Sequence, residues 1–112
     1  MDRLSETLAA VADPTRRALL HHLRQGPRSV HELAKPFQMS QQGISKHLTL
    51  LEKAQLIDKK KVGRESICQL KPMPLQELAG WVEQYREYWE QAVDRLEIFL
   101  TELEGKGDKD GS

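Results

Sequence analysis

The segment Ser29–Leu70 constrains the fold of this chain most strongly, because its pattern indicates two short helices, a tight turn and a hairpin. Ser40 is suited to cap the second helix, which we expect over residues 41–54. One face of that helix is apolar and consists of Ile44, Leu48 and Leu51. The opposite face carries Gln42, Ser45, Lys46 and Thr49. An apolar back with a front of amides, hydroxyls and an amine is typical of a helix that reads base edges in DNA.

A lysine-rich hairpin follows this helix. We expect strands over residues 57–62 and 66–70, and a two-stranded hairpin of this size must pack on the helices to be stable. Its basic side chains are Lys59, Lys60, Lys61 and Arg64. They would follow the DNA backbone toward a minor groove. Lysines on an edge strand also deter aggregation, and the two roles are compatible.

Four residues beside these elements are further candidates for contact with phosphate. Ser40 and Gln41 lie at the start of the helix, where free backbone N–H groups attract anions. Arg28 adds a positive charge directly before the helix expected at 29–35. His47 lies at the edge of the apolar face, where it would donate to a phosphate or pack as a half-buried ring. The alternative is that the polar face of the helix expected at 41–54 is an ordinary solvated surface.

Charge is divided between the two halves of the chain. The net charge of the 112 residues is zero, yet residues 1–71 carry 13 Lys and Arg against 7 Asp and Glu, and residues 72–112 carry 4 against 10. A basic half favours a polyanionic partner, and an acidic half indicates a different role.

The length of the chain predicts one domain. With no apolar run that could span a membrane and no signal peptide, we expect a cytoplasmic protein without a membrane partner.

Three shorter helices are expected before the polar-faced one, over residues 3–12, 14–25 and 29–35. Leu4 and Leu8 belong to the apolar stripe of the first. Ser29 and Glu32 have the spacing of a capping box, which predicts the start of the third.

The region after Pro74 has the pattern of one long amphipathic helix over residues 75–103. Its apolar positions alternate three and four residues apart for about four heptads. They include Leu78, Val82, Tyr85, Trp89, Ala92, Leu96 and Phe99. A domain this small cannot bury so long a stripe, so we expect a second subunit to cover it. The alternative is a helix packed only on its own domain.

Patterns that would support catalysis or metal binding are missing from the sequence. It contains no glycine-rich phosphate loop, no nucleophile elbow and no histidine pair at metal-binding spacing, so we expect neither an enzyme nor a metal or other cofactor. His31 stands alone. Cys68 is the single cysteine, which excludes a disulfide within one subunit. Its expected role is a small buried filler, and the alternative is a redox-sensing thiol.

The order of these elements, with their motifs, resembles the ArsR-type winged helix-turn-helix regulators. The motifs are Asp13-Pro14-Thr15-Arg16-Arg17, Val30-His31-Glu32-Leu33-Ala34, Met39-Ser40, Ile44-Ser45-Lys46-His47-Leu48, Leu56-Ile57 and Gly63-Arg64. The resemblance implies a mainly α fold with a small two-stranded β-wing. It further implies one domain over residues 1–104, in which 13–71 bind DNA and 3–12 and 75–103 are dimerisation helices. Residues 105–112, rich in glycine and charge, are expected to be disordered.

For function, the resemblance implies a homodimeric repressor that binds an inverted-repeat operator in double-stranded DNA. The helix at 41–54 would enter the major groove, and the wing at 59–64 would contact DNA beside it. Ligands of the family's metal-sensing members are missing here, so the chain is similar to the subgroup without those sites, and a small-molecule effector of unidentified kind fits that subgroup. The alternative is a protein-interaction module that acts through the long aromatic helix.

One departure from the family concerns Gln55. Family members often have glycine at this position, where a left-handed backbone ends the reading helix. A glutamine in that conformation costs about 1 kcal/mol. We therefore expect local strain after the reading helix, with the fold unchanged.

Overall fold

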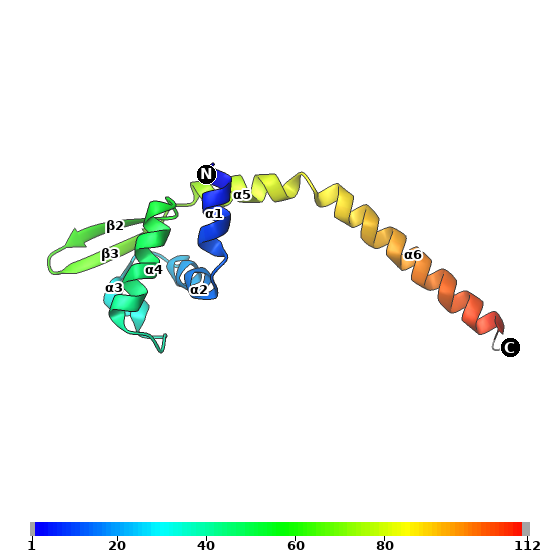
Figure 1. Cartoon of the computed structure of the whole chain (residues 1–112), viewed down its shortest axis with the longest axis horizontal. Coiled ribbons are helices and arrows are strands. Elements are labelled where there is room, and N and C mark those ends of the chain that lie inside the picture. Colours follow the sequence, from blue (N-terminus) through cyan, green and yellow to red (C-terminus); the bar gives the residue numbers. More distant parts are fainter. Residues whose placement is uncertain (1, 111–112) are drawn as a thin grey trace. The chain divides into compact units, whose positions relative to one another are not determined.

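The computed structural model describes residues 2–110, and the side chains of residues 2–105 (Figure 1). The order of elements is two helices, a short strand, two helices, two strands and two further helices. The chain divides after Leu78 into two compact units. The mainly helical fold with a small sheet confirms the predicted class.

The first two helices begin at aspartate caps. α1 spans Arg3–Val11, and α2 spans Pro14–Leu23. The carboxylates of Asp2 and Asp13 accept hydrogen bonds of 2.7 and 3.0 Å from backbone N–H groups three residues further on. These bonds satisfy N–H groups that have no partner within the helix, which fixes where each helix starts.

The helix-turn-helix consists of α3 and α4, and both begin where the sequence predicts. α3 spans Val30–Ala34 and α4 spans Gln41–Lys53. Ser29 and Glu32 make both bonds of the capping box, at 3.0 and 3.2 Å. The hydroxyl of Ser40 accepts a bond of 3.0 Å from a backbone N–H in the first turn of α4. Local capping chemistry therefore sets the start of the reading helix.

The apolar face of α4 lies in the centre of the core. Fully buried core side chains include Leu19, Leu23, Leu33, Ile44, Leu48, Leu51, Leu56 and Ile57. Burying one large aliphatic side chain contributes roughly 1.5–3 kcal/mol. Because three of these side chains come from α4, the rotation of this helix about its axis is fixed, and its polar side chains must face outward.

The sheet has three antiparallel strands, one more than predicted. β1 spans Arg28–Ser29, β2 spans Ile57–Val62 and β3 spans Glu65–Leu70, in the order β1-β3-β2. β2 and β3 form the predicted hairpin. The predicted two-stranded wing is confirmed, and β1 adds a third strand that the sequence did not predict, because its two residues are too few to show the alternation that marks a strand in sequence. The pairing of β1 with β3 ties the start of α3 to the wing.

Gln55 ends α4 in the left-handed conformation, as predicted. Its φ is +65°, and no other non-glycine residue of the described chain has a positive φ. The N–H of Leu56 donates to the carbonyl of Leu51 at 3.0 Å, which satisfies one of the last carbonyls of the helix. The Nζ of Lys71 donates to Oε1 of Gln55 at 2.9 Å, but this exposed bond competes with water and contributes little.

The long helix predicted over residues 75–103 is in fact two helices. α5 spans Met73–Glu83, and α6 spans Arg86–Asp110. Between them, the N–H groups of Gln84 and Tyr85 donate to carbonyls three residues earlier, at 3.3 and 3.0 Å. The single-helix prediction is wrong because this tighter turn ends α5 and takes Tyr85 out of the helical stripe. A pattern of apolar spacing carries no signal for such a change in backbone bonding.

α6 also continues past the point where the sequence predicts disorder. The predicted disordered tail covers residues 105–112, whereas the helix runs to Asp110. Each residue added to an existing helix gains one backbone hydrogen bond, which accounts for a helix that passes Gly105. Residues 111–112 lie outside the described part. Neither α6 nor any other helix of the described residues is long and apolar enough to cross a membrane.

Replacing Gln55 with glycine should stabilise the protein. Glycine adopts a φ of +65° without the steric cost of a Cβ, so we expect the free energy of unfolding to rise by about 0.5–1 kcal/mol in chemical denaturation. The matched control is Gln55→Ala, which removes the contact with Lys71 but keeps the Cβ, and it should not stabilise the fold. A glycine variant no more stable than the alanine variant would contradict the strain at this position.

Candidate nucleic-acid interface

The polar face of α4 is turned to solvent, as the burial of the opposite face requires. Gln41, Gln42, Lys46 and Thr49 are exposed, and Ser45 is half-buried. The hydroxyl of Thr49 donates to the carbonyl of Ser45 at 2.9 Å, so its proton is not available to an outside acceptor. Thr49 therefore presents a methyl group and oxygen lone pairs, whereas Gln42 and Lys46 present N–H donors. These groups suit base edges and phosphates, although the contact itself stays a prediction.

A polar cleft joins the front of α4 to the hairpin, and we call it the α4–wing cleft. It encloses about 200 Å³, and its lining includes Gln41, Ser45, Lys59, Arg64 and His31. Three segments that are separate in sequence thus bring donors and positive charge to one surface, together with the carboxylate of Glu65. His31 was not predicted to belong here, because a lone histidine carries no signal until the pairing of β1 with β3 brings the wing beside α3.

The three consecutive lysines of β2 do not share one face. Side chains alternate along a strand, so Lys59 and Lys61 point to one side and Lys60 to the other. Lys59 is half-buried in the α4–wing cleft, whereas Lys60 and Lys61 are exposed. Arg64 is exposed in the turn of the hairpin. The structure therefore brings only part of the predicted basic run into the cleft.

Ser40 and Arg28 lie apart from the α4–wing cleft. Ser40 is exposed, and its hydroxyl oxygen caps α4. Arg28 is half-buried and lines a second cleft of about 190 Å³ together with His22 and Lys35. Its guanidinium donates to the carbonyl of Pro27 at 3.4 Å. Arg28 thus lies at the start of β1, outside the lining of the α4–wing cleft.

His47 contacts residues at the start of α2. Its Nδ1 lies 3.3 Å from Nη1 of Arg16 and 3.8 Å from Oδ2 of Asp13, and 19% of the side chain is exposed. A hydrogen bond from the backbone N–H of Arg16 lowers the pKa of the Asp13 carboxyl, and the charge of Arg16 lowers it further. The half-buried ring is therefore observed, and a contact of His47 with phosphate stays a prediction.

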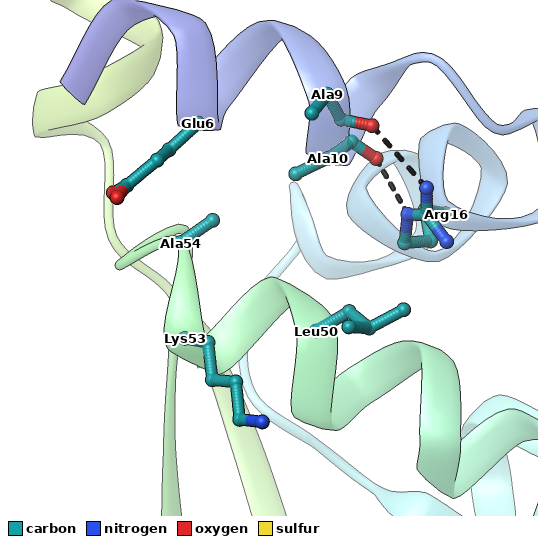
Figure 2. A pocket seen from close by; sticks show the side chains of 7 residues that line it. All are labelled: Glu6, Ala9, Ala10, Arg16, Leu50, Lys53 and Ala54. Atoms are coloured by element: carbon teal, nitrogen blue, oxygen red, sulfur yellow. Dashed lines mark hydrogen bonds between the residues drawn. The ribbon is translucent and has the colours of Figure 1, made fainter. Parts of the chain in front are cut away.

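Arg16 also connects α2 to the end of α1 (Figure 2). Its Nε donates to the carbonyl of Ala10 at 2.7 Å, and its Nη2 donates to the carbonyl of Ala9 at 3.2 Å. Beside it lies a cavity of about 260 Å³. The cavity is lined by Glu6, Ala9, Ala10, Arg16, Leu50, Lys53 and Ala54. Arg16 therefore forms part of the junction between α1, α2 and α4.

Cys68 fits the predicted role of a buried filler. Its side chain is 0% exposed in β3. Burial raises the pKa of the Cys68 thiol, and the nearby charge of Lys59 offsets this only in part. A thiol that is buried and hard to ionise is poorly suited to redox sensing. Among the described residues, no three His, Cys, Asp or Glu side chains gather as metal ligands would.

Most of the predicted dimer residues are apolar side chains that reach solvent. On α1, Leu8 is exposed and Leu4 is half-buried. On α5, Leu78 is half-buried and Val82 is exposed. α6 carries a row of exposed apolar side chains, which we call the α6 stripe: Trp89, Val93, Leu96, Phe99, Leu100 and Leu103. Ala92 of α6 is half-buried, and Tyr85 lies in the break before it.

Comparisons with known proteins agree with this architecture. Residues 11–60 match the family model described as a helix-turn-helix domain. The chain is 34% identical to the HTH-type transcriptional regulator Rv2034 of Mycobacterium tuberculosis, over 75% of this chain and 76% of that protein. It is 30% identical to the transcriptional repressor SdpR of Bacillus subtilis, over 70% of this chain and 88% of that protein.

A solved structure extends the similarity to the arrangement of the elements. The crystal structure of an ArsR family transcriptional regulator, RHA00566, is similar with a TM-score of 0.74 and 39% identity, over 80% of this chain and 98% of that one. The family model's match over residues 11–60 includes both helices of the helix-turn-helix, α3 and α4. The chain therefore belongs to the ArsR family of winged helix-turn-helix transcriptional regulators.

Proposed function

We propose that this DNA-binding transcriptional regulator is a homodimeric repressor of an inverted-repeat operator. The proposal rests on the α4–wing cleft, which Gln41 and Ser45 of α4 line together with Lys59 and Arg64 of the hairpin. α4 enters the major groove, and the hairpin contacts DNA beside it. Two copies related by a two-fold axis bind half-sites about one helical turn apart.

Gln42 and Lys46 are the side chains best suited to read bases. A glutamine amide pairs with adenine through two hydrogen bonds, and a lysine amine reaches the acceptors of guanine or a phosphate. Thr49 contributes differently, because its hydroxyl proton is bonded to the carbonyl of Ser45. Its methyl group suits contact with the methyl group of thymine. Ser45 then completes the reading face at the edge of the α4–wing cleft.

Phosphate contacts are proposed around this reading face. Gln41 lies at the start of α4, where backbone N–H groups without helical partners attract anions. Lys59 and Arg64 supply positive charge from the other side of the cleft. The excess of 13 basic over 7 acidic residues in positions 1–71 supports the same partner. Such contacts position the protein on DNA and make its affinity fall with salt.

A second copy of this chain is the proposed partner of the α6 stripe. Trp89, Leu96 and Phe99 are 43%, 55% and 55% exposed, and a continuous apolar row of this kind marks an interaction surface. Leu4 and Leu8 of α1 belong to the same proposed interface.

Repression of transcription is proposed because the similar protein SdpR is named a repressor. Since transcription is regulated at the DNA, we place the protein in the cytoplasm. A protein-interaction module without DNA binding is not favoured, because it leaves the α4–wing cleft without a role.

The wild-type protein should bind the DNA upstream of its own gene at low salt, with a steep loss of affinity as salt rises. Lys46→Ala should weaken binding about tenfold and reduce the magnitude of the salt slope by about one per subunit, measured by fluorescence anisotropy. Lys53→Ala is the matched control, because it removes the same charge from the last residue of α4, about two turns beyond Lys46, and should change neither quantity much. Failure of the wild type to bind at low salt would contradict the proposal.

A charge in the α6 stripe should dissociate the dimer. We expect Leu96→Glu to sediment as a monomer in analytical ultracentrifugation and to bind operator DNA weakly, because burying an unpaired carboxylate is costly. Thr101→Glu introduces the same side chain on α6 beside Asp94 and Ile98, away from the stripe, and should remain dimeric. A wild type that is monomeric at micromolar concentration, or a Leu96→Glu variant that stays dimeric, would overturn this interface.

A further inference from the structure

The contact between Arg16 and His47 determines which nitrogen of the imidazole carries the proton. Nη1 of Arg16 lies 3.3 Å from Nδ1 of His47. A guanidinium has N–H donors and no acceptor, so a hydrogen bond between these atoms requires an Nδ1 without a proton. The proton of the neutral ring must then be on Nε2, because one ring nitrogen donates and the other accepts.

The other group near Nδ1 does not favour the opposite tautomer. Oδ2 of Asp13 is 3.8 Å from Nδ1, beyond hydrogen-bond distance. The same oxygen already accepts the backbone N–H of Arg16 at 3.0 Å. Asp13 therefore supplies negative charge near Arg16 and His47, but no acceptor at hydrogen-bond distance for a proton on Nδ1.

Arg16 is held in a fixed position by the end of α1. Its Nε and Nη2 donate to the carbonyls of Ala10 and Ala9, at 2.7 and 3.2 Å (Figure 2). Two of its three nitrogens thus bind backbone atoms that cannot rotate away, and the third points to His47. A donor fixed in this way orients the ring as well as selecting its tautomer.

Nε2 of His47 reaches solvent. Among the described residues, Nε2 makes no hydrogen bond, and every buried side-chain nitrogen or oxygen there has a partner. Nε2 is therefore not a buried atom, although only 19% of the side chain is exposed. Its position on α4, about 100° around the helix from Lys46 and at the edge of the apolar face, places this N–H to the side of the proposed reading face.

We propose that Arg16 is a positioning residue for DNA binding, which fixes His47 as the Nε2–H tautomer and aims this N–H at a phosphate of the operator. The proposal rests on the proposed binding of DNA by α4. Arg16 itself touches no DNA in this arrangement. Arg16 acts through His47. Because its guanidinium also binds the carbonyls of Ala9 and Ala10, the orientation of the imidazole ring depends on the junction of α1 and α2.

The tautomer can be measured without DNA. Long-range 1H–15N correlation spectra of the labelled protein, at about pH 8.5 where free imidazole is neutral, should show a bare Nδ1 and a protonated Nε2 for His47. Arg16→Met should replace this by a mixture of tautomers. Arg17→Met is the matched control, since Arg17 donates to the carbonyl of Val11 at 2.8 Å and should leave the tautomer unchanged. A protonated Nδ1 in the wild type would overturn the proposal.

The contact with phosphate is tested by replacing His47 with glutamine and with asparagine, each of which carries an amide in place of the imidazole ring. His47→Gln puts an amide nitrogen near the position of Nε2, and His47→Asn puts it near Nδ1. We expect affinity for the upstream DNA within about threefold of wild type for the glutamine variant and a loss of about tenfold for the asparagine variant. Equal affinities of the two variants would overturn the proposal. If the wild type does not bind DNA, the proposed function fails, and the spectra still report whether Arg16 fixes the tautomer.

Discussion

The burial of one face of α4 is the constraint on which the rest of the structure depends. Ile44, Leu48 and Leu51 are completely buried, so any rotation of the helix about its axis would expose them at a cost of several kcal/mol. The same core anchors the wing, because Leu56 and Ile57 continue from the end of α4 into β2 and are also buried. The buried side chains of α4 point away from the α4–wing cleft. Their burial therefore determines the direction of the α4 side chains that line this cleft.

The features that could be predicted from sequence are those that depend on neighbours within a few residues. Ser29 with Glu32 and Ser40 mark the starts of α3 and α4, because a side-chain oxygen that accepts a bond three residues on is a local event. The left-handed Gln55 was predicted in another way, from the resemblance to a family whose members often have glycine at this position. The polar front of α4 follows from helical periodicity alone.

What could not be predicted depends on contacts between distant segments or on a small change in backbone bonding. His31 joins the cleft only through the pairing of β1 with β3, and His47 meets Arg16 only when α2 and α4 pack together. The lysine run could be counted, but its division between two faces required the strand to be placed. The break at Gln84–Tyr85 left no mark in an unbroken alternation of apolar residues.

In the proposed complex, the front of α4 and the wing act as one DNA-binding surface. A titration of 15N-labelled protein with its upstream DNA, followed by amide chemical shifts, tests this most directly. We expect the largest changes at Gln42, Ser45, Lys46 and Arg64, and a further change at His31, which lines the α4–wing cleft with Ser45 and Arg64. Changes confined to α6, with α4 and the hairpin unaffected, would contradict it.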